Sequence, residues 1–362
     1  MQRRLSILAL LSVLIFSACD TSDPAVRVVS GIYVGNQGNF TENNGSVTIH
    51  DPDTGETTNN AIPNLGGLVQ GILIDGDRAF VLLNFDDSFS TGRGRIDIVD
   101  LNTNQRTAQI DINTPRSAVI DGNTMWVTNL YANTVTPVDL TTNTPGTPIT
   151  VGTNPEGLVI SGNTLFVANN AFGFSTTVTQ IDTDTRAVER TIDVGCDGPK
   201  TLTRDNEGQI WVFCVGKTVY DPVTFEVLER TNGAVVVLDG TTGNEMARMD
   251  LEDQLGSFGI LGQEAFFSTE QDESWAIVGT RIARFNTATN ALVQMIDPEI
   301  PTDHAIGGVA YDEVNDWLLL GTVPPDFVSA GTVIIADRQG TEVSSFSAGI
   351  TPASIAIREG LE

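Results

Sequence analysis

The chain has 362 residues, 40% of them apolar, which is sufficient for one large domain or two smaller ones with packed cores. Its formal net charge of −27 argues against binding to a nucleic acid, whose phosphates require a basic surface, and against adhesion to anionic lipid headgroups. We interpret the acidity as a solvated surface that keeps an exported protein soluble, with cation binding as the alternative.

The first residues have the pattern of an export signal. Arg3 and Arg4 precede an apolar run, residues 5–16, that is too short to span a bilayer. Small residues then lead to Cys19 in an arrangement that resembles the lipobox of bacterial lipoproteins, in which the cysteine is lipidated. This predicts residues 1–18 as a lipoprotein signal peptide and Cys19 as the lipidation site. An ordinary signal peptidase site near a chance cysteine is the alternative.

Polar residues follow without a sustained pattern, so residues 19–30 are expected to form a lipidated tether. Residues 31–362 are expected to form a single domain. No later stretch of the sequence is long and apolar enough to cross a bilayer, which predicts that this domain lies outside the cytoplasm. We therefore expect an outer-membrane lipoprotein at the cell surface.

One pattern recurs seven times in the expected domain. Each copy is a run rich in β-branched residues that ends in an acidic or amide residue and leads into a turn. A spacing of about 40 to 57 residues accommodates four short strands, which form one blade of a β-propeller. The sequence therefore predicts an all-β fold, a seven-bladed β-propeller. The copies are residues 46–51, 95–100, 135–139, 178–182, 235–239, 282–286 and 333–337.

The two ends of the domain each contain part of a blade. Residues 31–36 open the domain without a preceding inner strand, and residues 351–357 have the pattern of an inner strand with nothing after it. Pairing these segments would close the ring and leave no free sheet edge at the seam. We therefore expect the C-terminal strand to pair with the first blade and to be essential for stability.

Acidic residues recur at the turns between the third and fourth strands. Asp side chains accept hydrogen bonds from backbone amides two residues further on, and so stabilise tight turns. We interpret these residues as turn formers and as poor catalytic candidates. They are Asp51, Asp100, Asp139, Asp182 and Asp239.

Two cysteines remain after Cys19, in a compartment where disulfides persist. Cys196 lies at the start of an expected inner strand, and Cys214 lies near the end of the next strand. A turn at residues 206–208 would fold the two strands back antiparallel. A disulfide and two separate buried thiols are both compatible with this arrangement.

In a propeller, the loops before each inner strand and between the second and third strands share one face around the central channel. Here these loops contain amides, a few charges and aromatic side chains, a composition suited to a large polar ligand or to a loop of a partner protein. Satisfaction of the local backbone is the alternative role for each amide. The predicted ligand-binding residues are Asn36, Gln37, Gln70, Asn84, Arg116, Asn129, Tyr131, Glu156, Asn169, Phe172, Lys200 and His304.

Signals for catalysis are weak. His50 and His304 are the only histidines and lie in different predicted blades, which gives neither a His-rich metal site nor a nucleophile–His pair. Residues 84–87 form an acidic run that could bind Ca²⁺, but we interpret it as a solvated loop because it has no EF-hand-like ligand spacing. We expect no catalytic residue, no metal site and no cofactor, and hence a protein that is not an enzyme.

Residues 125–143, continued at 149–157, resemble the YVTN repeat of YncE-like seven-bladed propellers, and this resemblance covers nearly the whole domain. Residues 31–40 and 209–214 are similar to stretches of YncE-like surface lipoproteins of Bacteroidetes and their relatives. The best understood members of that group capture vitamin B12 and related corrinoids and deliver them to a TonB-dependent transporter.

The resemblance implies a cell-surface lipoprotein that binds a ligand without chemistry. It implies a corrinoid as that ligand, a TonB-dependent transporter as the partner, and attachment to the membrane through the N-terminal lipid. A protein-interaction or envelope scaffold that uses the same face is the alternative function. A calcium-dependent, lactonase-like hydrolase is the third.

Overall fold

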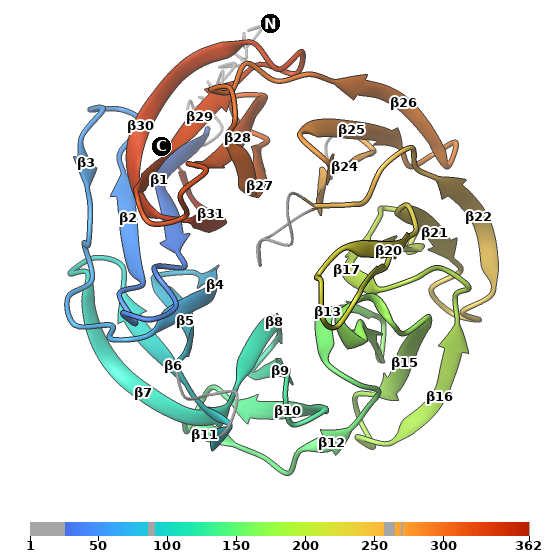
Figure 1. Ribbon diagram of the computed structural model, residues 1–362. Helices are drawn as coiled ribbons and strands as arrows, with labels where there is room; N and C mark the ends of the chain where they lie inside the picture. The colour runs from blue at the N-terminus through green and yellow to red at the C-terminus, as the bar shows by residue number, and fades with distance from the viewer. Residues whose placement is uncertain (1–25, 86–90, 257–264, 269–270, 362) are drawn as a thin grey trace, which may run out of the picture.

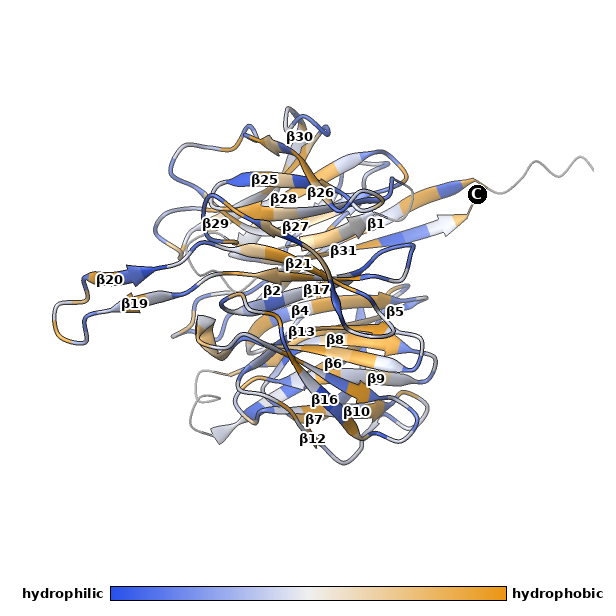
Figure 2. Cartoon of the chain, turned by 90° about the vertical axis from the view of Figure 1, so that its right-hand side faces the viewer, coloured by the Kyte–Doolittle hydropathy of each residue, from blue (hydrophilic) through white to orange (hydrophobic). Residues whose placement is uncertain are grey.

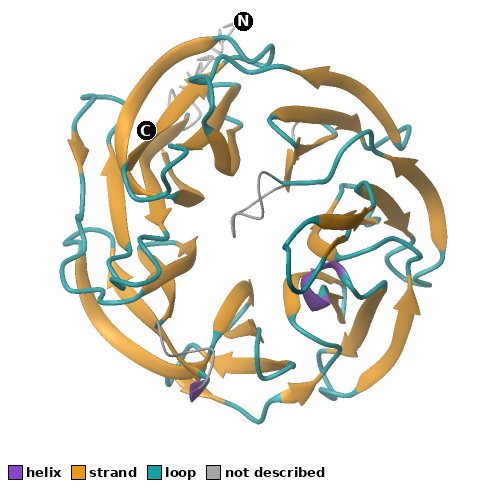
Figure 3. Cartoon of the chain, in the orientation of Figure 1, coloured by secondary structure: helices purple, strands orange, loops and turns teal. Residues whose placement is uncertain are grey.

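The computed structural model describes residues 26–85, 91–256, 265–268 and 271–361. Seven β-sheets surround a central axis, which confirms the predicted all-β, seven-bladed β-propeller (Figure 1). Strands make up nearly all of the regular structure (Figure 3). Within the described ranges, no helix has both the length and the hydrophobicity needed to span a bilayer.

The first four blades are sheets of antiparallel strands that follow one another outward from the channel. The third blade contains one further short outer strand. These blades consist of β31 (Pro352–Leu361), β1 (Arg27–Asn36), β2 (Ser46–His50) and β3 (Thr57–Thr58); β4 (Leu68–Asp75), β5 (Arg78–Asn84), β6 (Arg93–Asp100) and β7 (Gln105–Asn113); β8 (Pro115–Asp121), β9 (Thr124–Asn129), β10 (Thr134–Asp139), β11 (Thr144–Pro145) and β12 (Ile149–Thr150); and β13 (Pro155–Ser161), β14 (Thr164–Asn169), β15 (Thr177–Asp182) and β16 (Val188–Asp193).

The last three blades follow the same scheme, with one insertion in the fifth. This insertion is a separate two-stranded hairpin between the second and third strands of the blade. These blades consist of β17 (Pro199–Arg204), β18 (Ile210–Cys214), β21 (Ala234–Leu238) and β22 (Glu245–Asp250), with the inserted hairpin β19 (Thr218–Tyr220) and β20 (Val227–Arg230); β23 (Ala265–Ser268), β24 (Glu273–Val278), β25 (Arg281–Asn286) and β26 (Ala291–Ile296); and β27 (Ala305–Asp312), β28 (Trp317–Val323), β29 (Ala330–Ala336) and β30 (Glu342–Ile350).

The ring is closed by β31, which is the inner strand of the first blade although it comes last in the chain. It pairs antiparallel with β1, from Arg27 opposite Leu361 to Asn36 opposite Pro352. At the outer end of this pair, Arg27 also forms an ion pair with Glu359 at 2.8 Å. The predicted closure by the C-terminal strand is confirmed, and it leaves no free sheet edge at the seam.

The first strand begins earlier than the sequence analysis predicted. β1 includes residues 27–30, which were assigned to the tether, because Val28 pairs with Gly360 and Val29 is buried in the core. The predicted signal peptide, Cys19 and the first part of the predicted tether lie outside the described residues. The end of the sheet where Arg27 and Leu361 lie is on the face opposite the hairpin β19–β20 (Figure 2).

The core lies between neighbouring blades, because successive side chains of a strand point to opposite faces of its sheet and both faces are covered. The second strand of most blades contributes a large aromatic side chain that is almost completely buried. Each such burial stabilises the fold by about 1.5–3 kcal/mol or more. These side chains are Phe80, Trp126, Phe166, Trp211 and Trp275.

The turns between the third and fourth strands are organised as predicted. Asp239 Oδ1 accepts hydrogen bonds from the backbone N–H groups of Thr241 at 3.1 Å and Thr242 at 2.6 Å. The bonds from Thr242 hold the pKa of Asp239 below its ordinary value, because they stabilise the carboxylate. Equivalent bonds are accepted, with the same effect on the pKa, by Asp51, Asp100, Asp139 and Asp182.

These turns predict a loss of stability in acid. Because folding lowers the Asp pKa values, the unfolded chain binds protons first as the pH falls below the ordinary value of 3.8. The stabilisation is complete above that pH and is lost below it. Replacing Asp139, Asp182 and Asp239 by Asn keeps an acceptor oxygen but removes the titration. The urea midpoint of this variant should fall less between about pH 5 and pH 3 than that of the wild type; an equal fall would contradict the assignment.

Ring closure gives a second prediction. A chain that ends at Thr351 lacks β31, so the first blade loses its inner strand, which packs between the inner strands of the seventh and second blades. We expect this variant to show no cooperative melting transition in circular dichroism. A control chain that ends at Gly360 retains nearly all of the β1–β31 pairing and should melt within a few degrees of the intact protein. An unchanged melting temperature for the shorter chain would overturn this account of closure.

Candidate functional site

Four polar side chains are directed into the central channel by irregularities at the start of the inner strands. In the pairs β4–β5, β8–β9, β13–β14 and β17–β18, the inner strand has one residue more than its partner, which is a β-bulge. A bulge turns a side chain away from the face that a regular strand would give it. The residues at these bulges were all predicted as ligand contacts: Gln70, Arg116, Glu156 and Lys200.

Arg116 and Glu156, on neighbouring inner strands, form a buried ion pair. Arg116 Nε lies 2.5 Å from Glu156 Oε2, and Arg116 Nη1 donates a hydrogen bond to Gln70 Oε1 at 3.0 Å. The two charged side chains are only 4% and 6% exposed. Each buried charge depends on its partner, because the surrounding protein cannot replace the water that solvated it. The pair therefore fixes the geometry of this part of the channel wall.

These side chains line a cavity of about 440 Å³ in the channel. Its wall also includes apolar residues, among them Leu73, Leu158 and Ile355. In the first and seventh blades, the equivalent bulge positions are occupied by Ala353 and Gly307. Among the described residues, the large polar side chains at these positions therefore lie in the second to fifth blades; the start of the inner strand of the sixth blade is outside the described residues.

A second cavity, of about 700 Å³, shares Glu156 and Lys200 with the first. Its walls come from the short helix η1 (Ala171–Gly173), the hairpin β19–β20 and residues 253–256. Arg230 and Asp253, which also line it, form an ion pair at 2.8 Å. We call this the upper cavity, because it lies on the face that carries the hairpin (Figure 2), and the other the channel cavity. The shared residues place the charged groups between the two cavities.

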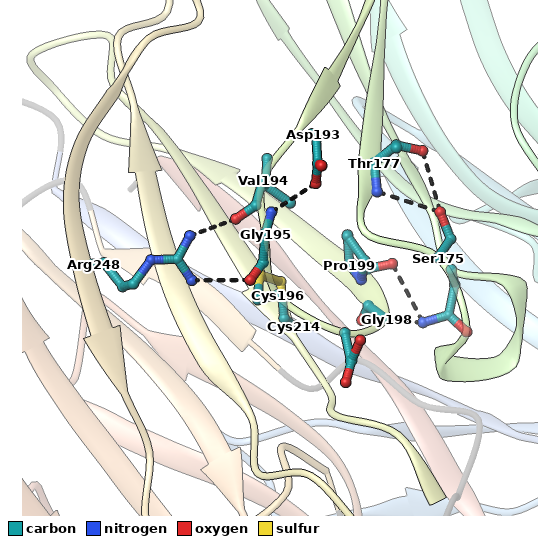
Figure 4. Close-up of a disulfide and its surroundings, with 12 residues drawn as sticks. Ser175, Thr177, Asp193, Val194, Gly195, Cys196, Gly198, Pro199, Cys214 and Arg248 are labelled. Carbon is teal, nitrogen blue, oxygen red and sulfur yellow. Dashed lines mark hydrogen bonds between the residues drawn. A yellow bond between two sulfur atoms is a disulfide. The ribbon is translucent and has the colours of Figure 1, made fainter. Parts of the chain in front are cut away.

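A disulfide joins Cys196 and Cys214 beside the site (Figure 4). Cys196 precedes the inner strand on which Lys200 lies, and Cys214 ends the strand from which the inserted hairpin departs. In the same loop, Asn170 Nδ2 donates a hydrogen bond to the Gly198 carbonyl oxygen at 3.1 Å. The disulfide therefore connects the segment that carries Lys200 to the strand from which the hairpin departs. Of the two predicted alternatives, the structure contains the disulfide and not two separate thiols.

Three predicted amides do not face either cavity. Asn36, Asn129 and Asn169 occupy the last position of the second strand in their blades and are completely buried. Asn169 Oδ1 accepts a hydrogen bond from the N–H of Gly152 at 3.0 Å, and its Nδ2 donates to Thr179 Oγ1 at 3.0 Å. These amides connect strands and loops inside the protein, which is the alternative role considered for them, and they are absent from the described walls of both cavities. The buried Asn84 holds the equivalent position in the second blade.

Of the remaining predicted residues, Phe172 lines the upper cavity. Burial raises the pKa of Tyr131, while the charge of Arg116 lowers it and that of Glu156 raises it, so this phenol is close to the ion pair. Like the three buried amides, Tyr131 and the remaining predicted contacts are absent from the described walls of both cavities; these remaining contacts are Gln37, Asn84 and His304.

Within the described part of the chain, no group of three or more His, Cys, Asp or Glu side chains could hold a metal ion. His50 stacks on Phe346 with the ring centroids 4.0 Å apart, and so contributes to packing. Of the acidic run that was interpreted as a solvated loop, with calcium binding as the alternative, residues 86 and 87 lie outside the described residues.

The inserted hairpin, from which Tyr220 and Val227 line the upper cavity, is not among the elements predicted from the sequence. A signal for it was present in the sequence. Asp221 Oδ1 accepts hydrogen bonds from the N–H groups of Val223 and Thr224, both at 2.8 Å, in a further copy of the Asp turn. The long interval between the fourth and fifth copies of the repeat also indicated an insertion.

No protein-family model and no curated protein matches the chain, but solved structures are similar to it. A Bacteroides fragilis protein assigned as a 6-phosphogluconolactonase is similar over 93% of this chain and 99% of its own, with a TM-score of 0.65 and 11% identity. The periplasmic gluconolactonase of Pseudomonas aeruginosa is similar over 92% of this chain and 99% of its own, with a TM-score of 0.65 and 14% identity. The hydrazine synthase of Kuenenia stuttgartiensis is similar over 81% of this chain and 95% of its own, with a TM-score of 0.60 and 16% identity.

The similarity to two proteins named as lactonases corrects the expectation that this protein is not an enzyme, because enzymes also use this fold. At 11% and 14% identity, the similarity establishes the propeller fold alone. The fold implied by the resemblance to YncE-like propellers is confirmed. Membership of that group and a corrinoid ligand stay predictions.

The buried ion pair gives a test of this geometry. Replacing Arg116 by Gln should lower the free energy of unfolding by about 3–5 kcal/mol, because Glu156 would stay buried without its partner. The double variant R116Q/E156Q should recover much of this loss. Replacing Arg27, whose pair with Glu359 is exposed, should cost no more than about 1 kcal/mol. Urea unfolding measures these differences, and equal losses for the two arginines would contradict a special role for the buried pair.

Proposed function

We propose that the protein binds a small anionic molecule in the channel cavity. The observation that carries this proposal is that Arg116, Glu156 and Lys200 bury more than nine-tenths of their surface and yet line the cavity. Burial of charged groups is costly, and folds retain it chiefly where the charges have a partner or a function. Arg116 and Lys200 place two cationic side chains in the described wall of this cavity, and we propose these as the groups that bind an anion.

The cavity also indicates the size and polarity of the ligand. Volumes of about 440 and 700 Å³ lie in the range of small-molecule sites. Besides the charged residues, the polar residues Gln70, Ser117 and Thr201 line the channel cavity, and residues of these types can form hydrogen bonds with hydroxyl groups. An aldonic acid, which combines one carboxylate with several hydroxyls, fits this set of groups. We therefore propose a sugar acid or its lactone as the ligand.

Hydrolysis of such a lactone is the second candidate function. It is supported by the two similar structures that are named as lactonases and by the Glu156 carboxylate in the cavity wall. A carboxylate within reach of a bound water can act as a general base. Its ion pair with Arg116 would also hold this carboxylate in a fixed orientation.

A corrinoid is retained as a ligand candidate because of the resemblance of the sequence. The structure supports it less than the sequence did, because Asn36, Asn129 and Asn169 are enclosed. We also propose that the protein is a surface lipoprotein attached through Cys19. The described chain starts at the face opposite the hairpin, so attachment on that side would leave the upper cavity accessible to a ligand or a TonB-dependent transporter.

Calorimetric titration of the purified protein with D-gluconate, D-glucono-1,5-lactone and cyanocobalamin tests these proposals. Replacing Lys200 by Gln should weaken gluconate binding by about tenfold or more, since a hydrogen bond to a charged group contributes about 1.5–3 kcal/mol. The melting temperature should change by only a few degrees. Lys217, the other lysine of the chain and absent from both described cavity walls, gives the matched control K217Q.

The outcomes separate the candidate functions. Binding of gluconate that K200Q weakens and K217Q does not would support the anion site. Acid release from the lactone in a pH-stat, lost in E156Q, would support hydrolysis. Binding of cyanocobalamin alone would favour corrinoid capture. If none of the three compounds binds, the proposal is wrong and a protein-interaction scaffold becomes the better interpretation.

A further inference from the structure

Two exposed aromatic side chains line the upper cavity. Phe172 belongs to η1, in the connection between the second and third strands of the fourth blade, and Tyr220 belongs to the hairpin inserted at the same place in the fifth. Each is 56% exposed. Val227, which pairs with Tyr220 across the hairpin, lines the same cavity. Figure 3 shows η1 and the hairpin close together on this side of the ring. Large apolar side chains that gather around a cavity mark a binding surface more often than isolated ones do.

The backbone that presents Phe172 is strained. Ala171 and Phe172 have φ values of 48° and 55°, a left-handed conformation that costs an L-residue roughly 1–2 kcal/mol. The loop is held by its hydrogen bonds: Ala171 N–H donates to the Thr153 carbonyl at 3.1 Å, and Gly173 N–H donates to Asn170 Oδ1 at 3.2 Å. Burial of Phe172 does not offset this strain, because more than half of the surface of this residue is exposed to solvent. Such outliers gather at functional sites.

The hairpin is also held at its base. Gln254 Nε2 donates hydrogen bonds to the carbonyl oxygens of Lys217 and Thr231, both at 3.1 Å, and to Thr218 Oγ1 at 3.0 Å. These bonds connect the two ends of the hairpin to the next blade. Tyr220 is therefore presented from a fixed support, as Phe172 is.

Cationic side chains lie next to the aromatic ones. Lys200 and Arg230 line the upper cavity, and Arg116 lies beneath it in the wall of the channel cavity. Arg116 and Arg230 form ion pairs with Glu156 and Asp253. Lys200 lies where the two cavities meet, so a ligand in the upper cavity could reach it.

From these observations we infer that Phe172 and Tyr220 form an aromatic clamp that stacks on a planar, conjugated ring of the ligand, while an anionic group of the same ligand lies at Lys200. Aromatic faces bind flat rings by stacking, whereas a saturated ring presents only apolar surface. This inference rests on the proposed anion site. It adds that the ligand class is an anion that carries a planar ring system.

The test uses two probes that have the same charge and nearly the same size. 2-Naphthoate has a planar aromatic ring, and decahydro-2-naphthoate is its saturated counterpart. Stacking of a ring on an aromatic side chain contributes about 1–3 kcal/mol, or about five- to 150-fold in affinity. Replacing Phe172 or Tyr220 by Leu, which keeps apolar surface, should weaken naphthoate binding at least fivefold and change binding of the saturated probe by less than twofold.

Phe174 gives the matched control. It is as exposed as Phe172 and only two residues away, but it is not among the described residues that line the upper cavity. The variant F174L should bind both probes as the wild type does. All three positions are exposed, so the variants are expected to fold, which thermal melting checks. Equal losses for the two probes, or no loss in F172L and Y220L, would overturn the aromatic clamp.

The variant K200Q separates this inference from the proposed function. If K200Q weakens naphthoate and gluconate binding while F172L changes neither, the anion site holds and the clamp is wrong. If F172L and Y220L weaken naphthoate binding while K200Q does not, the clamp holds and the anion is not bound at Lys200. If naphthoate does not bind although gluconate does, the clamp is wrong; if neither binds, both proposals are wrong.

Discussion

The pairing of β31 with β1 is the constraint on which the rest of the structure depends. In a propeller, each sheet packs only against its two neighbours, so an open ring would expose two apolar sheet faces. The inner strands of the first and seventh blades also approach closely: a Cβ added at Gly308 would lie 2.5 Å from the Ala353 carbonyl oxygen. Closure therefore sets the width of the channel, and with it the positions of the polar side chains that line it.

The sequence predicted the number of blades well because the signal is local. A β-branched run followed by a turn such as that at Asp239 is determined by residues close together in the chain. The direction of a side chain near the channel is not local. Arg116 and Asn129 both lie near strand ends on one face, but only Arg116 lines a cavity. A bulge shifts the strand pairing by one residue, so that a side chain points to the other face of the sheet. The pattern of hydrophobic residues in the sequence does not show where a bulge occurs.

The candidate site forms where the chain departs from its own repeat. The repeated strands supply a rigid and nearly symmetric frame, whereas the large polar side chains described at the channel come from the second to fifth blades. Both longer elements of the upper cavity, η1 and the hairpin β19–β20, are additions to neighbouring blades. The disulfide Cys196–Cys214 lies where these additions meet the frame. The repeated strands support the site, and the segments added to two neighbouring blades give the upper cavity walls that differ from one side to the other.

The seam also determines the order in which the molecule can be completed during synthesis. Arg27 and Glu359 are 332 residues apart in sequence and meet in the same sheet. The second to seventh blades are each built from one continuous stretch of chain and can form as that stretch emerges from the ribosome. The first blade cannot, because its inner strand is made last. Until β31 is made, β1 presents an unpaired edge, so the nascent protein depends longest on protection from aggregation at its first blade.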